Sequence, residues 1–334
     1  MNTENTKNET IGRISAIQRD VFMILYEGKE YQGRLKGTFF KNKDEIIPLV
    51  GDYVDFYLNP AGDSIVNAVV NRRNYMERPD QKGHAYQYVK TMCAQGMIAN
   101  FDYVFIVTSL NGDYSYNRIA RYVSIALQDE AIPVVILTKS DMCNNPGRYV
   151  REVEGLSEKV RVHAISALYG IGTDELEEYF EPGKTIALLG SSGAGKSTLV
   201  NAVVGEEIMK TSEIRESDSK GRHTTTYRQL VELPNGAVII DTPGMREIGI
   251  MEAGDGISNT FEDIIELQSC CKFSDCKHNT EPGCAIKAAI NDGSLSEDRY
   301  YLFLSLQQEN GNNREKMIQI AKWKKQRAKL SKES

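Results

Sequence analysis

The chain has 334 residues, 41% of them hydrophobic and 26% charged, which is ordinary for a soluble globular protein with two or three domains. No apolar run approaches the length of about 18 residues that indicates a membrane-spanning helix, and the polar N-terminus lacks the apolar core of a secretion signal. A net charge of −6 argues against a uniformly basic nucleic-acid binder. Together these features predict a cytoplasmic protein that makes no membrane contact.

The N-terminal part of the chain predicts a small β-barrel. Residues 1–9 are polar and are expected to be a disordered tail, whereas residues 10–75 contain short alternating runs broken by turn residues. Five such runs in about sixty residues favour a closed barrel of the OB-fold type. OB-folds often bind single-stranded nucleic acid through exposed aromatic and basic side chains, although most aromatic side chains in a small barrel form its core.

The pattern then changes from short strands to alternating strands and helices. Residues 75–99 form a mixed polar segment that is interpreted as a linker, and residues 76–252 are predicted to hold an α/β domain followed by a third domain at 253–334. Alternation of this kind indicates a mostly parallel sheet with helices on both faces, which binds ligands at the carboxyl ends of its strands. The expected strands lie at residues 102–107, 133–137, 160–165, 185–189, 229–233 and 237–240.

A glycine-rich loop follows the apolar run at residues 185–189. Its pattern, G-x-x-x-x-G-K-[ST] between a strand and a helix, is typical of a phosphate-binding loop. Backbone N–H groups and the positive end of the helix would hold phosphate oxygens, Lys196 would reach the outer phosphates and Ser197 would ligate Mg²⁺. The predicted nucleotide-binding residues of this loop are Gly190, Ser191, Ser192, Gly193, Ala194, Gly195, Lys196, Ser197 and Thr198.

Two other segments that follow strands point to guanine as the base. The carboxylate of Asp141 would accept hydrogen bonds from N1–H and the exocyclic amine of guanine, whereas adenine presents an unmatched acceptor there. The pair Ser166-Ala167 follows the next strand, where small GTPases supply a backbone N–H to guanine O6. Standing alone, the first segment would be a charged turn at a strand end. The residues assigned to the base are Thr138, Lys139, Ser140, Asp141, Ser166 and Ala167.

The segment Asp241-Thr242-Pro243-Gly244 is predicted to sense the γ-phosphate. An acidic residue at this point holds Mg²⁺, usually through water, and the glycine N–H meets the phosphate, so the loop can act as a switch. Between it and the phosphate loop lie three consecutive threonines, one of which, assigned as Thr225, would complete the Mg²⁺ shell; a solvated loop has the same composition. The magnesium ligands are therefore predicted as Ser197, Asp241 and Thr225, with Gly244 and Asp241 also contacting GTP.

The order of these segments indicates a circular permutation. In an ordinary GTPase the base-recognition segments follow the phosphate loop, and here they precede it. With this order, and with Gly221-Arg222-His223-Thr224-Thr225-Thr226, the chain resembles the RsgA (YjeQ-like) family of circularly permuted GTPases that act in assembly of the small ribosomal subunit. The resemblance covers nearly the whole chain. One departure from the common GTPase pattern is Thr138 in place of Asn, which weakens the expected contact to guanine N7.

The resemblance also implies a catalytic role for His223. Ras-type GTPases place a water-positioning Gln directly after the glycine of the switch, and Met245 stands there in this chain. By similarity to the family, His223 is the candidate that orients or activates the attacking water. A neutral imidazole near its ordinary pKa can accept the necessary hydrogen bond at cellular pH.

Four of the six cysteines lie between residues 270 and 284, a clustering that in a reducing compartment favours a metal over disulfides. Three thiolates and one imidazole make the Cys₃His set of a structural zinc site, in which four protein ligands leave no position for a substrate. Spacing alone leaves Cys270 as a further possible ligand, and similarity to the RsgA family selects Cys271 instead. The predicted ligands of one structural Zn²⁺ are Cys271, Cys276, His278 and Cys284.

The C-terminal segment is basic. Residues 311–334 contain eight Lys or Arg and two Glu, a balance of +6, which suits either an rRNA contact or a solvated helical end. The chain as a whole is thus predicted to be a monomeric GTPase that hydrolyses GTP to GDP and phosphate. The resemblance to the RsgA family implies that its barrel and its mostly helical zinc-binding domain bind rRNA during late maturation of the small (30S) ribosomal subunit. The alternative is an rRNA-binding module in which GTP is mainly a structural ligand.

Overall fold

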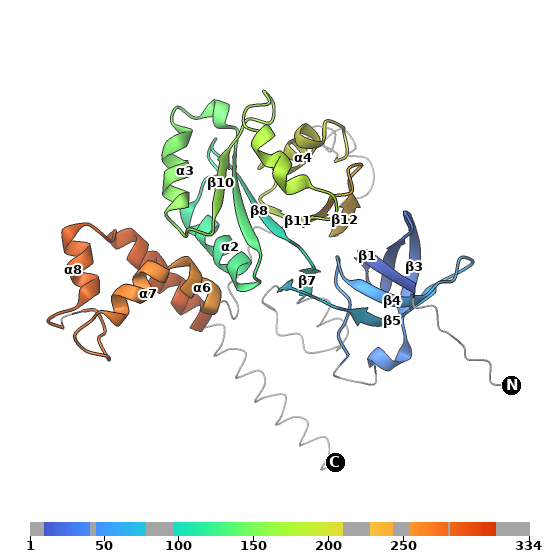
Figure 1. Cartoon of the computed structure of the whole chain (residues 1–334), viewed down its shortest axis with the longest axis horizontal. Helices are drawn as coiled ribbons and strands as arrows, with labels where there is room; N and C mark the ends of the chain where they lie inside the picture. The colour runs from blue at the N-terminus through green and yellow to red at the C-terminus, as the bar shows by residue number, and fades with distance from the viewer. Residues whose placement is uncertain are drawn as a thin grey trace, which may run out of the picture.

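The computed structural model describes residues 10–40, 45–77, 96–209, 228–242, 254–279 and 281–311, so the predicted tail at 1–9 lies outside it (Figure 1). The first described segment forms a barrel. Strand β1 pairs with both β2 and β4, β3 pairs with β2 and, in parallel, with β5, and β5 pairs with β4, so the ring of strands closes. The predicted closed barrel of five strands is confirmed. Its strands are β1 (Thr10–Gln18), β2 (Val21–Tyr26), β3 (Lys29–Leu35), β4 (Tyr53–Tyr57) and β5 (Ser64–Val70), with the 3₁₀ helix η1 (Gly37–Phe40) after β3.

The central domain is built on a mostly parallel sheet, as predicted. Among the described strands the order is β10-β9-β8-β11-β13-β12, and every neighbouring pair is parallel except β12 with β13. The parallel strands share one carboxyl edge, where ligands bind in sheets of this kind. The strands are β8 (Tyr103–Ser109), β9 (Ile132–Thr138), β10 (Arg161–Ala164), β11 (Thr185–Gly190), β12 (Gln229–Glu232) and β13 (Val238–Asp241).

Helices cover both faces of this sheet (Figure 1). Successive side chains of β8 point to opposite faces, so Val104 and Ile106 join the hydrophobic core shared with α2, and Phe105 and Val107 join the core shared with α4. Burial on both faces explains why these strands are almost continuously apolar in sequence. The helices are α2 (Tyr116–Gln128), α3 (Pro146–Glu154) and α4 (Lys196–Val204), with the 3₁₀ helices η2 (Ser140–Met142) and η3 (Asp174–Phe180).

The barrel and the central sheet are joined directly. Ala16 of β1 pairs with Gln229 of β12, so one sheet of eleven described strands runs through both domains. Three residues before Ala16 on β1, the buried Arg13 side chain donates hydrogen bonds to the backbone oxygens of Gly51 and Asn100, each at 3.1 Å, and to Thr185 Oγ1 at 2.9 Å. A buried guanidinium needs such partners, since an unpaired buried charge is costly. Arg13 therefore ties the barrel to the first residue of β11.

The segment at residues 75–99 is not simply a linker. Strand β6 (Tyr75–Glu77) pairs antiparallel with β7 (Gly96–Ala99), and residues 78–95 between them lie outside the described part of the chain. Met76, Met97 and Ile98 are fully buried or nearly so, which explains why the two ends of the segment are ordered against the core.

The described C-terminal part is helical, as predicted, and packs on α2. It contains α6 (Gly254–Thr260), α7 (Glu262–Ser269), α8 (Ala285–Asp292) and a further helical stretch at residues 297–311. Helix α6 approaches α2 closely: a Cβ on Gly256 would lie 1.9 Å from the Ser124 backbone oxygen, and the hydroxyls of Ser124 and Thr260 are 3.0 Å apart. Only glycine at position 256 allows α6 to cross α2 at this distance, so α6 packs tightly against the central domain.

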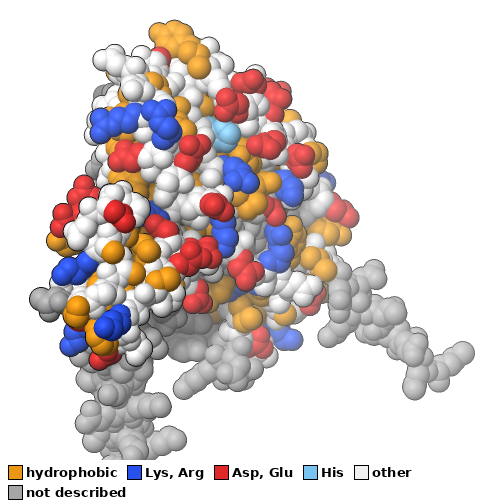
Figure 2. Space-filling view, turned by 60° about the vertical axis from the view of Figure 1, so that its left-hand side comes forward, with side chains coloured by type: hydrophobic (Ala, Val, Ile, Leu, Met, Phe, Trp, Pro, Cys, Tyr) orange, Lys and Arg blue, Asp and Glu red, His pale blue; other side chains and the backbone are white. Residues whose placement is uncertain are grey.

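The surface on that side of the molecule is mixed in charge. On the face shown in Figure 2, acidic and basic side chains are interspersed, with no broad area of one sign. Among the described helices, none has the length and apolar composition needed to cross a membrane.

Candidate functional site

The phosphate loop begins where β11 ends. Gly190 has φ +151°, and a Cβ there would lie 2.3 Å from the Val107 backbone oxygen of the neighbouring β8, so only glycine allows this approach. Helix α4 starts six residues later, at Lys196, which leaves its N-terminal end facing the loop. The Lys196 ammonium donates to the backbone oxygens of Gly190 at 2.8 Å and Ser191 at 3.0 Å. The predicted strand–loop–helix context is therefore present.

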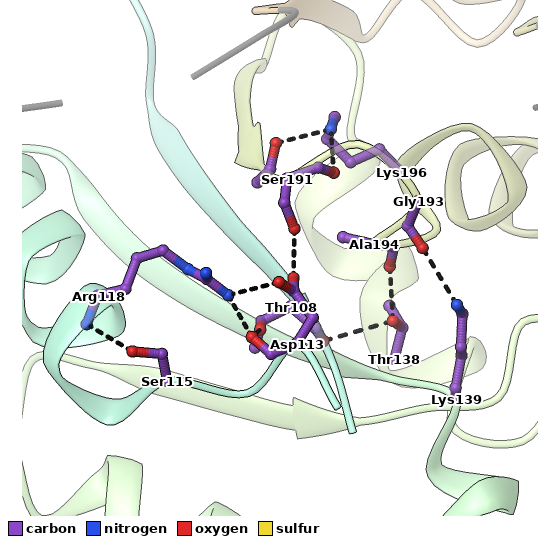
Figure 3. A network of polar contacts seen from close by, with 11 residues as sticks. Thr108, Asp113, Ser115, Arg118, Thr138, Lys139, Ser191, Gly193, Ala194 and Lys196 are labelled. Atoms are coloured by element: carbon purple, nitrogen blue, oxygen red, sulfur yellow. Dashed lines mark hydrogen bonds and ion pairs between the residues drawn. The ribbon is translucent and has the colours of Figure 1, made fainter. Parts of the chain in front are cut away.

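The segment at residues 138–141, which is predicted to recognise the base, lies directly against this loop (Figure 3). The buried Thr138 hydroxyl, at the end of β9, donates to the Ala194 backbone oxygen at 2.6 Å. Lys139 has φ +57° and donates through its ammonium to the Gly193 backbone oxygen at 3.1 Å. Two side chains that precede the loop in sequence by more than fifty residues thus hold its backbone.

The second base-recognition segment adjoins the first. The Ser140 N–H donates to the Ile165 backbone oxygen at 3.0 Å, which places residues 166–167 beside residues 138–141. Ser166 is buried, and its hydroxyl has no hydrogen-bond partner among the described residues, whereas the side chain of Asp141 is exposed at the sheet edge. An accessible carboxylate beside a buried unpaired hydroxyl and nearby backbone groups can recognise a polar planar base.

Asp241 lies on the side of the phosphate loop away from residues 138–141. It ends β13 in register with Leu188 of β11 and is 9% exposed, so it lies on the strand beside the one that carries the phosphate loop. Ser197, in the first turn of α4, is the other predicted Mg²⁺ ligand within the described residues. A hydroxyl and a carboxylate on adjacent elements are the oxygen donors that Mg²⁺ uses next to nucleotide phosphates. His223, Thr225 and Gly244 lie outside the described residues.

One residue at this edge was missed by sequence reasoning. Asp113 lies in the loop between β8 and α2, and its carboxylate accepts a hydrogen bond from the Ser191 hydroxyl of the phosphate loop. It also forms an ion pair with Arg118 at 3.0 Å. No motif contains Asp113; the only signal is that it follows the carboxyl end of a predicted parallel strand.

The cysteine cluster forms a second candidate site. The donor atoms of Cys271, Cys276, His278 and Cys284 all lie within 4.8 Å of one another, and Cys270 is exposed and outside this group. His278 Nδ1 is 3.6 Å from Cys271 Sγ and 3.4 Å from Cys284 Sγ. A tetrahedral zinc ion with ordinary bond lengths holds its sulfur and nitrogen ligands about 3.6 Å apart. The four residues therefore have the chemistry and spacing to bind a metal ion.

The environments of the thiols differ. Burial raises the pKa of the Cys276 thiol to about 11, and a hydrogen bond from the backbone of His278 only partly offsets this. Burial also opposes ionisation of Cys271, but hydrogen bonds from the backbone N–H groups of Ala285 and Ile286 and from the thiols of Cys276 and Cys284 together outweigh it and lower the pKa of Cys271. Donors from the first turn of α8 thus already favour the thiolate that a metal requires.

Comparison with known proteins agrees with the fold and identifies the family. A family model described as RsgA GTPase matches residues 69–251, more than half of the chain. The chain belongs to the RsgA GTPase family. It is therefore a GTPase, and the resemblance inferred from the order of its motifs is confirmed.

Relatives within the RsgA family match almost the whole chain. Small ribosomal subunit biogenesis GTPase RsgA 1 of Listeria monocytogenes is 40% identical over 299 residues, which cover 89% of this chain and 83% of the relative. Small ribosomal subunit biogenesis GTPase RsgA 2 of Vibrio vulnificus is 43% identical over 311 residues, covering 93% and 84%. The crystal structure of YjeQ from Thermotoga maritima superposes with a TM-score of 0.64 at 26% identity and covers 89% of this chain and 97% of that one.

Proposed function

We propose that this RsgA-family chain binds GTP with Mg²⁺ at the carboxyl edge of its central sheet and hydrolyses it during biogenesis of the small ribosomal subunit. The observation that carries the proposal is the contact between the two halves of the permuted site. Thr138 and Lys139 hydrogen-bond the backbone of the phosphate loop at Ala194 and Gly193, so a base and its phosphates can be held together. The ribosomal role is that of the relatives, which are named small ribosomal subunit biogenesis GTPases.

Each part of the nucleotide has a proposed partner. Guanine would be recognised by the exposed carboxylate of Asp141 and by the backbone at residues 166–167, while the phosphates would lie on residues 190–198 with Lys196 at the outer ones. Mg²⁺, when bound, neutralises charge on the β- and γ-phosphates. Ser197 and Asp241 would hold that ion within the described part of the site, with Thr225 as the proposed third ligand.

The proposed chemistry is attack by water on the γ-phosphorus. The water oxygen forms a bond to phosphorus as the bond to the β–γ bridging oxygen breaks, GDP leaves with the electron pair, and the water proton passes to the phosphate products. His223 is proposed to orient this water, since Met245 has no side chain that accepts or donates a strong hydrogen bond. The charge that develops is stabilised by groups placed before the reaction, Lys196 among them.

A structural Zn²⁺ is the proposed occupant of the cysteine cluster. The sulfur–nitrogen separations of 3.4 and 3.6 Å support zinc, and four protein ligands leave it without an open position for catalysis. The ion would tie the loop at residues 271–284 to α8. This gives a helical zinc-binding domain at 253–334, which together with the barrel at 10–75 is proposed to contact rRNA in the cytoplasm.

Nucleotide turnover with and without small ribosomal subunits tests the proposal. We expect GTP but not ATP to be hydrolysed, subunits to stimulate turnover, and binding to subunits to be tighter with a non-hydrolysable GTP analogue than with GDP. Turnover that subunits leave unchanged would favour the alternative of an rRNA-binding module that uses GTP as a structural ligand. Preference for ATP would refute the assignment of the base-recognition residues.

A further inference from the structure

The phosphate loop is held from a third direction by Asp113, a residue that belongs to none of the nucleotide-binding motifs. Figure 3 shows Asp113 between Ser191 and Arg118, with the Ser191 hydroxyl pointing at its carboxylate. Ser191 is the first residue after Gly190 and is 4% exposed. Hydrogen bonds to ionised acceptors are roughly twice as strong as neutral ones, so this contact is a strong constraint on the start of the loop.

Ser191 has a second partner that makes this constraint relevant to nucleotide binding. Its backbone oxygen accepts a hydrogen bond from the Lys196 ammonium at 3.0 Å, and the oxygen of the preceding Gly190 accepts another at 2.8 Å. Asp113 therefore fixes the side chain of Ser191, while the backbone oxygen of Ser191 orients the Lys196 ammonium. A shift of Ser191 moves the carbonyl that orients Lys196.

Asp113 is itself immobilised on the sheet and on α2. The Arg118 guanidinium pairs with its carboxylate at 3.0 Å and also donates to its backbone oxygen, and the Thr108 hydroxyl donates to that same oxygen at 3.2 Å. The Arg118 charge also offsets the carboxylate, which would otherwise repel phosphates at this distance from the loop. About three quarters of each side chain is shielded from solvent, so the pair is less screened than an exposed one.

We propose that Asp113 is a positioning residue for the GTPase reaction, acting through the Ser191 hydroxyl to hold the carbonyl that orients Lys196. This inference rests on the proposed binding of GTP at the phosphate loop. It assigns Asp113 no contact with the nucleotide. Because Lys196 reaches phosphates that both GTP and GDP carry, the effect applies to both nucleotides.

Titration of a fluorescent guanine nucleotide into the full-length protein provides the test. Asp113→Ala and Ser191→Ala should each raise the dissociation constants for GDP and GTP by roughly 10- to 150-fold, as expected for a lost hydrogen bond to a charged group. The value of kcat/KM should fall by at least the same factor. The double variant should bind no more weakly than the weaker single variant, since both remove one interaction.

Two further variants separate positioning from general stability. Asp113→Asn keeps an oxygen that accepts from Ser191 and should bind within about threefold of the unsubstituted protein. Glu309→Ala is the control. It removes the ion pair of Glu309 with Arg121 at 2.8 Å, which is about as exposed as the Asp113–Arg118 pair and also involves an arginine of α2, and it should leave nucleotide affinity unchanged. If Asp113→Ala is poorly folded, Ser191→Ala and Asp113→Asn still test whether Asp113 acts through the Ser191 hydroxyl.

Equal nucleotide affinity in folded Asp113→Ala or Ser191→Ala and in the unsubstituted protein would overturn the inference. Additive losses in the double variant would also overturn it, because they would mean that Asp113 acts by some route other than Ser191. A protein without substitutions that fails to bind either guanine nucleotide would instead refute the proposed function, so the two failures are distinguishable.

Discussion

The hydrogen bonding of Thr138 predicts that the affinity for guanine nucleotides depends little on the N7 atom of the base. Its hydroxyl has a single proton, which is donated to the Ala194 backbone oxygen at 2.6 Å, and the Thr108 backbone oxygen at 3.4 Å is a second acceptor nearby. Guanine N7 is an acceptor and needs a donor. Because Thr138 is 3% exposed and its proton is engaged, it has none to offer. An Asn at this position would have two N–H donors and could serve both the loop and N7.

Two changes test this prediction. The ligand 7-deaza-GTP lacks the N7 acceptor, and the substitution Thr138→Asn gives the protein a donor for N7. A neutral hydrogen bond contributes about 0.5–1.5 kcal/mol, or roughly two- to tenfold in affinity. The protein as it stands should bind GTP and 7-deaza-GTP within about twofold of each other, and Thr138→Asn should open a preference for GTP of roughly two- to tenfold. Competition against a fluorescent guanine nucleotide measures both ratios on one preparation.

The matched control is Thr138→Val, which keeps the shape of the side chain and removes the hydroxyl. It leaves the Ala194 oxygen without its donor and should weaken both nucleotides equally. A clear preference of the unsubstituted protein for GTP over 7-deaza-GTP, by fivefold or more, would refute the reasoning, because it would require a donor to N7 that Thr138 does not supply.

Three other predictions follow from the site and the fold. His223→Ala should leave GTP affinity intact while single-turnover hydrolysis falls by about 100-fold or more, and unchanged hydrolysis would remove His223 from the mechanism. Cys276→Ser should release close to one equivalent of zinc, measured by a colorimetric chelator, and lower the melting temperature, whereas Cys270→Ser should do neither. Gly256→Ala should destabilise the protein by at least about 2 kcal/mol in urea unfolding, because its Cβ would lie 1.9 Å from the Ser124 oxygen; a loss below 0.5 kcal/mol would mean that α6 moves away freely.

The barrel and the central sheet could be predicted from sequence because their signals are local. Two-residue alternation marks half-buried strands, and continuous apolar runs such as residues 133–137 mark strands buried on both faces. The join between the domains has no such signal, since one pair, Ala16 with Gln229, is brought together over more than two hundred residues. Strands β6 and β7 were missed because each is at most four residues long and a polar segment separates them.

The residues of the candidate sites also fall into those that local motifs predict and those that depend on contacts distant in sequence. The phosphate loop, the base segments and the cysteine cluster are motifs whose spacing carries the chemistry, so the sequence predicts them directly. The choice between Cys270 and Cys271 depends on which side chain faces the cluster, and spacing does not determine that. Asp113 was missed because its role depends on a contact with Ser191, 78 residues further along the chain.

The junction at Arg13 has a mechanical consequence for the nucleotide site. Arg13 donates a hydrogen bond to Thr185 at one end of β11, and the phosphate loop begins at Gly190 at the other end. Five residue steps along a strand separate these points by about 17 Å. The barrel therefore contacts β11 at the end of the strand farthest from the phosphate loop, so a partner that binds the barrel could reorient the proposed nucleotide site from a distance.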